Sequence, residues 1–315
     1  MTKYILRRCL LAVPTVILVM FMTFMMLRLV PGSLVDTMMA DRPYATPEDR
    51  AALEKQLGLD EPIPQQFATY VWHVARGDLG DSPWTSTPVT DELRRRLPVT
   101  AEFGLMAIII GLCVSLPIGV LSAIRQDTLS DYVARSFAIL ALSVPYFFSA
   151  TIIIVFGPKW GWTPPLIYKG WSAGPFSHLY YFLAPATLLG LSLAGGVMRL
   201  TRTMMLEVLR QDYIRTAWAK GLRERSVISR HAMKNALIPV ITIVGLQVGT
   251  AVSGTIILET IFNMPGVGRY FVGAILQRDY PSVQGVVLVL ATVIVVVNLV
   301  IDLSYAWLDP RIRYS

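Results

Sequence analysis

Six long apolar runs divide this chain, and each carries at most one charged residue. A helix rises about 1.5 Å per residue, so roughly 20 apolar residues cross a hydrocarbon layer of about 30 Å. Water-soluble helices rarely reach that length without a polar face. The runs therefore predict an all-α polytopic membrane protein with six transmembrane helices. They cover residues 9–30, 100–123, 136–156, 179–198, 236–262 and 283–306.

The composition supports this class. The chain is 54% hydrophobic and 16% charged, against roughly 25% charged residues in an average soluble domain. The net charge of +7 is explained by where the basic residues lie, and does not require a nucleic-acid partner. The two cysteines, Cys9 and Cys113, both fall in apolar runs, so the sequence predicts no disulfide framework.

The distribution of Lys and Arg predicts the orientation. With the N-terminus inside, the inner segments hold 16 basic residues and the two short outer loops hold four. The positive-inside rule then places both termini in the cytoplasm. Arg94, Arg95 and Arg96 lie near the second span on the predicted outer side. They count against this orientation, but the basic residues of the inner segments outnumber them. The first run exceeds the about 7–15 residues of a signal peptide and no Ala-x-Ala site follows, so we expect it to remain as a helix.

This orientation predicts four parts: a tail with the first helix (1–30), an external loop (31–98), a five-helix core (99–306) and a cytoplasmic tail (307–315). The external loop carries helix signals. Thr46-Pro47-Glu48-Asp49 is typical of a helix start. Apolar residues at 67, 70, 71 and 74 have helical spacing before Gly77, and 89–97 predicts a third short helix ending at Pro98. We favour a lid packed on the outer mouth over a separate domain.

The segment 199–235, called the basic loop below, is the most informative part outside the spans. It holds nine basic residues and three acids. Residues 207–220 lack Gly and Pro and predict an amphipathic helix, which Gly221 can end by a left-handed turn. A second basic helix then enters the fifth span at Pro239. Two interpretations of the basic loop stay open. It is either a rigid bracket that pushes on a docked partner or a hairpin that lies on anionic lipid headgroups.

Charged residues within the runs lie near their ends, at Arg28, Glu102, Glu259 and Asp302. We favour structural pairing over substrate handling for them, because side chains near a span end can reach water. Three histidines (His73, His178 and His231) fall in separate predicted loops and give no metal-site spacing.

The fifth run combines a small-residue stripe with polar side chains. Gly245, Gly249 and Ser253 favour close helix packing. Gln247, Thr250 and Thr255 add polar groups that favour either helix packing, which we prefer, or a pathway lining. Pro117 and Pro145 lie within the second and third runs and predict kinks.

Several strings, in one order along the chain, resemble those of bacterial ABC importer permeases, in the B-type subunit of the oligopeptide/dipeptide/nickel branch. DYIRTAWAKGL, followed by a basic helix and Pro239, resembles the EAA loop of that family. Arg215-Thr216-Ala217 stands where a Glu-Ala-Ala would be, and Pro239 lies 18 residues after Gly221, which fits the peptide branch. The other strings are Val30-Pro31-Gly32, Gly77-Asp78-Leu79-Gly80, Pro98-Val99-Thr100, residues 259–268 (ETIFNMPGVG), Arg278-Asp279-Tyr280-Pro281 and Asp309-Pro310-Arg311.

The resemblance implies a type I importer permease that forms half of a pathway for peptides or a similar small polar solute. It implies a homologous C-type permease as heterodimer partner, ATPase subunits of D and F type (or one fused ATPase) and a lipid-anchored or periplasmic binding protein, all at a bacterial inner membrane. ATP and Mg²⁺ would belong to the ATPases, because this chain has no phosphate-binding loop and no cofactor of its own. ATPase coupling is expected at Asp212, Tyr213, Arg215, Thr216, Ala217, Lys220, Gly221 and Leu222, with residues 125–135 as a minor contact. Gating or pathway roles are expected at Gln247, Thr250, Ser253, Glu259, Pro265, Gly266 and Gly268.

Other functions are less well supported. Importers of nickel, glutathione, haem or glycosides share this scaffold, so the solute stays open. A secondary carrier working alone would predict internal repeats and ion ligands at mid-span, which the sequence does not show. A membrane enzyme would require a catalytic cluster, and no Ser/His/Asp, His-Glu-x-x-His or paired-acid pattern is present.

Overall fold

The computed structural model describes residues 2–308 except 31, 33, 41–45 and 166; the side chains of residues 2–9, 40, 173 and 302–308 are also outside the described part. Asp302, as a side chain, and the string Asp309-Pro310-Arg311 therefore lie outside it. The regular secondary structure of the described residues is helical. These residues form no strand, only one isolated β-bridge between Asp81 and Pro88. The chain divides into two compact units: Met1–Val99 with Pro265–Leu299, and Thr100–Met264 with Val300–Ser315.

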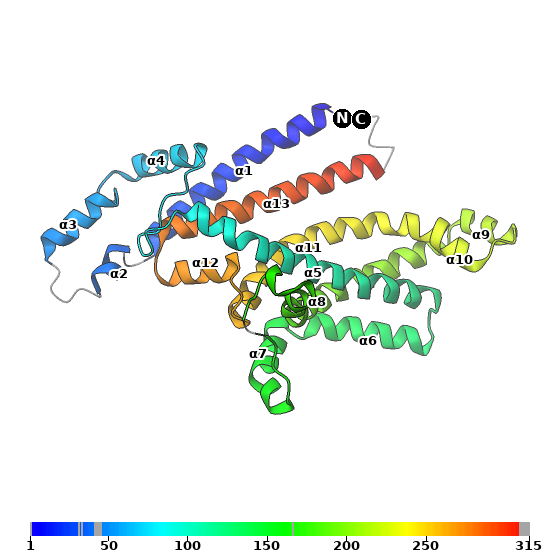
Figure 1. Cartoon of the computed structure of the whole chain (residues 1–315). Helices are drawn as coiled ribbons and strands as arrows, with labels where there is room; N and C mark the ends of the chain where they lie inside the picture. The colour runs from blue at the N-terminus through cyan, green and yellow to red at the C-terminus, as the bar shows by residue number, and fades with distance from the viewer. Residues whose placement is uncertain (1, 31, 33, 41–45, 166, 309–315) are drawn as a thin grey trace. The chain divides into compact units, whose positions relative to one another are not determined.

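The first unit combines a long N-terminal helix with the predicted external loop and the chain's last two helices (Figure 1). Its core joins Val89 and Leu93 of α5 to Val267 of α12 and Val286 of α13, all buried. The helices are α1 (Thr2–Leu29), α2 (Leu34–Ala40), α3 (Pro47–Gln56), α4 (Ile63–Ala75), the start of α5 (Val89–Ile124), α12 (Val267–Leu276) and most of α13 (Tyr280–Leu308).

The helix start predicted at residue 46 is confirmed. The Thr46 hydroxyl accepts a hydrogen bond from the Asp49 N–H, and the Asp49 carboxylate accepts one from the Thr46 N–H. This reciprocal capping box satisfies two donors that the first turn leaves unpaired. The stop after α4 is confirmed as well, because Gly77 takes a φ of +80°.

The aromatic residues of α4 pack on α1. The ring of Phe67 lies edge-on to Phe24, with 5.2 Å between centroids, and Tyr70 stacks on Phe24 at 6.2 Å. Burial raises the pKa of Tyr70 to about 12, since the phenolate would lose its hydration. Beyond α4, hydrogen bonds from the Gly80 N–H and the His73 ring lower the pKa of Asp78.

The external loop also attaches to the corner between α12 and α13. The Ser82 hydroxyl donates to the Asp279 carboxylate at 2.5 Å, and the Trp84 ring N–H donates to the Gln277 carbonyl at 3.0 Å. The prediction of a separate short helix at 89–97 was wrong, because α5 continues through Pro98 into the second span. The stabilisation from burying Val89 and Leu93 against α12 and α13 exceeds the cost of the one backbone hydrogen bond that Pro98 cannot donate.

The second unit is built around α8 (Pro175–Leu209), the most buried of the candidate spans (Figure 1). Gly190 lets α8 approach α5 closely: a Cβ built there would lie 2.5 Å from the Ala107 carbonyl oxygen. The other elements are the rest of α5, α6 (Leu129–Ser143), α7 (Tyr146–Phe156), the short helices Gly157–Trp160 and Trp171–Ala173, α9 (Asp212–Ala219), α10 (Glu224–Ser226), a π-helical segment (Val227–Ala232) and α11 (Met233–Ile261).

Five helices of the described chain are long and apolar enough to span a membrane, and α6 with α7 forms a sixth span only if the pair is counted together. The third predicted span, 136–156, is therefore not one straight helix. The chain bends by 82° between α6 and α7. Pro145 supplies the cause: it has no N–H to donate, and it holds the preceding Val144 in extended backbone (φ −89°, ψ 115°).

Two carboxylates near the span ends pair within the second unit, as expected for structural groups. The Thr100 hydroxyl donates to the fully buried Glu259 carboxylate at 2.7 Å. The Glu102 carboxylate lies 2.7 Å from the His178 ring nitrogen and accepts a 3.0 Å hydrogen bond from the Trp171 ring N–H. The assignment of His178 to a loop was wrong: it lies in α8 and is 2% exposed.

Candidate functional site

The basic loop folds as a short helix turned back against the end of α8. The predicted continuous helix over 207–220 was wrong, because α8 ends at Leu209 and α9 begins at Asp212. Gln211 between them is extended (φ −73°, ψ 148°). The break lets α9 bury Ile214 and Ala217 in one cluster with Met205 of α8.

The far end of α9 forms the predicted left-handed turn at Gly221, whose φ is +74°. The N–H groups of Lys220, Gly221 and Leu222 return to the Thr216, Trp218 and Ala217 carbonyls respectively. These hydrogen bonds satisfy carbonyls that the last helical turn would otherwise leave unpaired. The turn then leads into α10.

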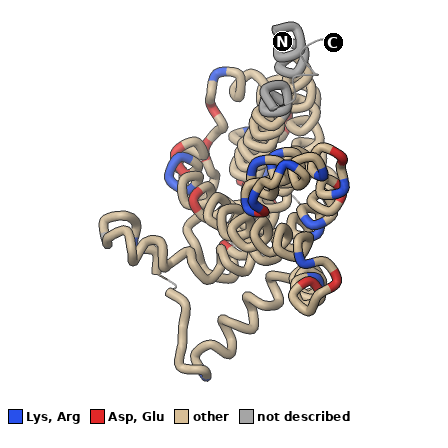
Figure 2. The backbone as a smooth tube through the Cα atoms, turned by 90° about the vertical axis from the view of Figure 1, so that its right-hand side faces the viewer, with Lys and Arg blue, Asp and Glu red and all other residues tan. Residues whose placement is uncertain are grey.

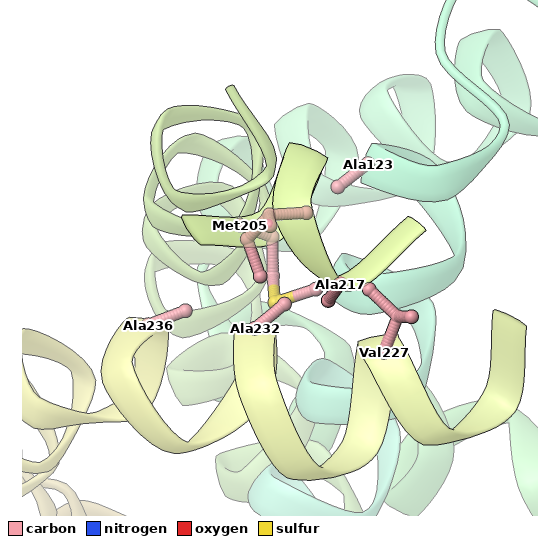
Figure 3. Close-up of a cluster of buried hydrophobic side chains, with 7 residues drawn as sticks. Ala123, Met205, Ala217, Val227, Ala232 and Ala236 are labelled. Carbon is pink, nitrogen blue, oxygen red and sulfur yellow. The ribbon is translucent and has the colours of Figure 1, made fainter. Parts of the chain in front are cut away.

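The inner face of α9 is locked by a small apolar core. Ile214 and Met205 are fully buried, and Ala217 is 6% exposed. Figure 3 shows the Met205 side chain reaching toward Ala232 and Ala217, with alanines on several sides that permit close approach. The cluster comprises Ala123, Met205, Ile214, Ala217, Val227, Ala232 and Ala236, from α5, α8, α9, the π-helical segment and α11. Because it joins five elements, α9 is held as part of the unit.

The outer face of α9 presents aromatic and charged side chains. Tyr213 and Trp218 are 43% and 45% exposed. The Tyr213 hydroxyl accepts a 2.7 Å hydrogen bond from Asn235, which fixes its direction. Arg215 pairs with Asp212 at 3.2 Å in an exposed ion pair. Of the eight predicted coupling residues, the structure leaves Asp212, Tyr213, Arg215, Thr216, Lys220, Gly221 and Leu222 exposed and buries Ala217.

Lys and Arg residues are frequent in the segments at this end of the unit. Figure 2 looks onto the end of the unit that holds α9 and α10 and shows Lys and Arg segments along its turns. After Gly221 the chain passes through α10 and the π-helical segment into α11, and continues as helix through Pro239. The predicted second basic helix is thus confirmed, and its π-helical segment is a feature that sequence reasoning missed. Such segments are frequent at functional sites.

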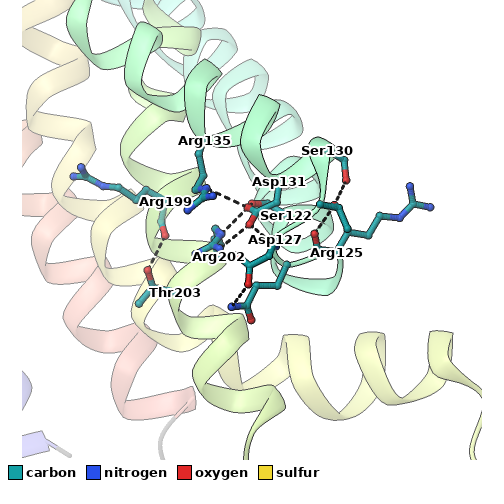
Figure 4. A network of polar contacts seen from close by, with 11 residues as sticks. Ser122, Arg125, Asp127, Ser130, Asp131, Arg135, Arg199, Arg202 and Thr203 are labelled. Atoms are coloured by element: carbon teal, nitrogen blue, oxygen red, sulfur yellow. Dashed lines mark hydrogen bonds and ion pairs between the residues drawn. The ribbon is translucent and has the colours of Figure 1, made fainter.

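A buried ion-pair network joins the 125–135 segment to α8 (Figure 4). The fully buried Asp131 carboxylate accepts two hydrogen bonds of 2.8 Å from the Arg202 guanidinium and one from the Ser122 hydroxyl. The Asp127 N–H donates to the same carboxylate at 3.0 Å. Sequence reasoning missed the pair. Only Arg135, one helical turn after Asp131, gave a local signal, and its contact is long, at 3.7 Å.

The predicted pathway residues fall in different environments. Gln247 donates a 3.0 Å hydrogen bond to the Leu193 carbonyl on α8, and with Thr250 it lines a pocket between α8 and α11. Arg199 and Thr203 of α8 line the same pocket. Ser253 is exposed on α11, where Thr250 is exposed as well.

The remaining predicted pathway residues do not join this pocket. Glu259 is fully buried and paired with Thr100. Pro265 precedes α12, Gly266 is its N-cap residue, and Gly268 is buried in its first turn. Pro265, Gly266 and Gly268 belong to the first unit. No group of three or more His, Cys, Asp and Glu side chains that could hold a metal ion occurs among the described residues.

The comparisons with known proteins agree on one family. The chain matches "Binding-protein-dependent transport system inner membrane component" over residues 115–314, and the N-terminal component of the same system over residues 1–104. It is 39% identical to the dipeptide transport system permease protein DppB of Escherichia coli K12 over 100% of both chains. It is 38% identical to DppB of Alkalihalophilus pseudofirmus and 39% identical to a putative peptide transport system permease of Brucella abortus, again over 100% of each chain.

Solved structures support the same fold. A chain of the MetNI methionine ABC transporter superposes with a TM-score of 0.55 at 16% identity, over 69% of this chain and 96% of that one. A chain of an amino acid ABC transporter superposes with a TM-score of 0.52 at 15% identity, over 70% and 94%. This likeness shows the type I importer permease fold. The full-length matches go further: the chain belongs to the family of binding-protein-dependent transport system inner membrane components.

Proposed function

We propose that this chain is the permease subunit of an ATP-driven importer of peptides, and that it forms half of the translocation pathway. The full-length identity of 39% to a dipeptide transport permease is the observation that carries the proposal. The family is one of transport components, so the chain is a transport subunit and not an enzyme. It is a multi-pass protein of the bacterial inner membrane, and we further place the basic loop and both termini in the cytoplasm.

The basic loop supplies the mechanical link in this proposal. Its α9 and the turn after it offer Tyr213, Trp218 and Leu222 as exposed anchors, while Ile214 and Ala217 are held in the buried cluster. A helix fixed on one face and exposed on the other can transmit a displacement without absorbing it. Closure of a pair of ATPases around α9 would therefore move the attached ends of α5, α8 and α11 together.

ATP drives transport only if the ATPases bind it better in one state of the permease than in the other. In the proposed cycle, ATP-bound ATPases favour the outward-open state, and hydrolysis returns the pathway to the cytoplasm. A second, homologous permease supplies the other half of the pathway. An external binding protein delivers the peptide. The pocket with Gln247 and Thr250 is our candidate for the pathway lining on this subunit.

Reconstitution tests the proposal. The chain is placed in vesicles with the second permease, the ATPases and the binding protein encoded beside it, and dipeptide uptake is measured with and without ATP. We expect uptake only with ATP and the full set of subunits. The same uptake is measured with nickel, glutathione or haem added as competitor, to compare these solutes with the dipeptide. Uptake by the lone chain without nucleotide, or no competition by any peptide, contradicts the proposal.

Crosslinking tests the docking of α9. In a background with Cys9 and Cys113 changed to Ser, we expect Thr216→Cys on the exposed face of α9 to crosslink to an ATPase subunit. Ser172→Cys, exposed in the short helix Trp171–Ala173, is the matched control and should give no such product. Equal crosslinking at both positions, or none at residue 216 in the active complex, contradicts the assignment.

A further inference from the structure

A groove between α6 and α8 lies beside the Asp131 network and is not used by the proposed mechanism. Its walls are apolar: Ala134, Ala138, Ile139 and Leu142 from α6 face Met198 from α8. The small side chains of Ala134 and Ala138 are nearly buried, and they leave the space open. Beyond them the helices meet, because Gly195 of α8 lies close to the Ala138 carbonyl and the Leu142 side chain.

One end of the groove is strongly cationic. Three arginines line it, Arg135, Arg199 and Arg202, and no Asp or Glu is among the described residues that line the groove. Asp131 lies beneath Arg202 and takes both of its short hydrogen bonds, so it neutralises that one cation. Arg135 reaches the same carboxylate only at 3.7 Å and keeps 40% of its side chain exposed. The groove therefore has two cations with unused donors.

The second of these cations is Arg199. No ion pair joins it to a carboxylate among the described residues. In Figure 4 its side chain leads away from Asp131, whereas Arg125 points to the opposite side of the network. Arg135 and Arg199 thus offer charge to a ligand at the mouth of the groove, and Arg125 does not.

We propose that this groove binds one anionic phospholipid. The phosphate would be held between Arg135 and Arg199, and one acyl chain would lie against Ile139 and Leu142, which are 62% and 48% exposed. The path from residue 135 to residue 142 is about 10 Å of helix, long enough for the upper part of an acyl chain. Basic pockets between spanning helices suit anionic headgroups. A free phosphate would use the cations and leave the apolar walls uncovered, so the lipid is the occupant that fits both features.

Native mass spectrometry of the purified complex tests the proposal, with phosphatidylglycerol and phosphatidylethanolamine as the added lipids. We expect one tightly held phosphatidylglycerol that phosphatidylethanolamine does not replace. Arg135→Gln and Arg199→Gln should each weaken binding about five-fold, and the double variant about thirty-fold, since each basic side chain near an anionic surface contributes a similar increment. Arg125→Gln, in the same loop with the same charge change, should bind normally.

The single variants keep the test valid if the double variant does not assemble. Arg202 already holds Asp131, so Arg135→Gln leaves the buried network intact; Arg199 also borders the pocket of Gln247, which Arg135 does not. Equal binding of both lipids, unchanged binding by Arg135→Gln and Arg199→Gln, or an equal loss in Arg125→Gln overturns the proposal. So does a photocrosslinker at residue 139 that captures a polypeptide of the complex instead of lipid.

Discussion

The Asp131 carboxylate on α6 and the Arg202 guanidinium on α8 form a two-point ion pair, with both N–O distances at 2.8 Å. The carboxylate is fully buried and the guanidinium side chain is 18% exposed. Ser122 adds a third helix, α5, to the same carboxylate. Breaking a buried pair leaves one charge without compensation, which costs far more than an exposed pair contributes.

We therefore expect Asp131→Ala to destabilise the chain by about 3–5 kcal/mol, because Arg202 loses its partner in a site with little water. The measurement is thermal unfolding in detergent, followed by tryptophan fluorescence. Arg94→Ala is the control: it removes a 3.7 Å pair with Asp91 in which the side chains are 82% and 55% exposed, so a change below about 1 kcal/mol is expected. Similar losses in both variants would show that the network contributes no more than a surface pair.

Local sequence patterns predicted the helix ends of this fold better than the contacts between helices. The helix start at Thr46 and the turn at Gly221 depend on neighbouring residues, so the sequence sufficed for both. Asp131 and Arg202 lie 71 residues apart, and Glu102 and His178 lie 76 apart. Pairs of residues so far apart in the chain produce no periodic pattern in a single sequence.

The same difference explains the errors at the candidate site. The break between α8 and α9 falls in a stretch without Gly or Pro, where local propensity favours one helix. Burial of Ile214 and Ala217 against Met205 decides otherwise, and that contact exists only after the chain turns back. Seven of the eight residues expected to carry coupling are exposed on α9 or in the turn that follows it, and Ala217 is buried.

Close packing of α5 on α8 gives a second prediction. A Cβ at Gly190 would lie 2.5 Å from the Ala107 carbonyl oxygen, and backbone cannot rotate away as a side chain can. We expect Gly190→Ala to destabilise by about 1–3 kcal/mol through overpacking. The thermal midpoint of the purified chain measures it.

Gly249→Ala is the matched control for Gly190→Ala. Apart from its chain neighbours and the backbone of its own helical turns, no heavy atom of the described residues lies within 4 Å of a Cβ built there. Ala is also the better helix former by up to about 1 kcal/mol. Its midpoint should stay equal or rise. If Gly190→Ala is as stable as Gly249→Ala, the two helices can separate without cost and the packing argument is wrong.

Tyr70 gives a prediction for the external loop. Its buried hydroxyl has no hydrogen-bond partner among the described residues, so Tyr70→Phe removes an unmet polar group and keeps the ring against Phe24. We expect stability to be unchanged or to rise by about 1 kcal/mol. A loss above that amount would reveal a partner for the hydroxyl.

The pH dependence of this variant has a definite sign. The pKa of Tyr70 rises from 10 to about 12 in the folded chain, so the unfolded chain releases the proton first as pH increases. The stabilisation that the neutral phenol provides is complete below pH 10 and is lost as pH rises toward 12. The wild-type chain should therefore lose stability relative to Tyr70→Phe between pH 10 and about pH 12, the window between its unfolded and folded pKa values. Parallel curves for the two proteins would contradict the burial of this side chain.

Gly221 connects the structure of α9 to the proposed coupling. Its φ of +74° costs a residue with a Cβ about 1–2 kcal/mol, most of all a β-branched one, whereas Asn adopts this region more readily. Open space surrounds the position within the described residues, so the strain comes from the backbone and not from a clash. We expect Gly221→Val to reorient the turn and lower the peptide transported per ATP hydrolysed about ten-fold, the factor that corresponds to this strain.

Gly221→Asn separates backbone strain from loss of the glycine as such. It should assemble with the ATPases and keep most of the wild-type ratio of uptake to hydrolysis, measured in the same vesicles. Copurification of the ATPases with Gly221→Val distinguishes failed docking from docking without coupling, and either one supports a role for the turn. A wild-type ratio in Gly221→Val, or a loss in Gly221→Asn as large as in Gly221→Val, would show that the left-handed turn does not transmit the motion.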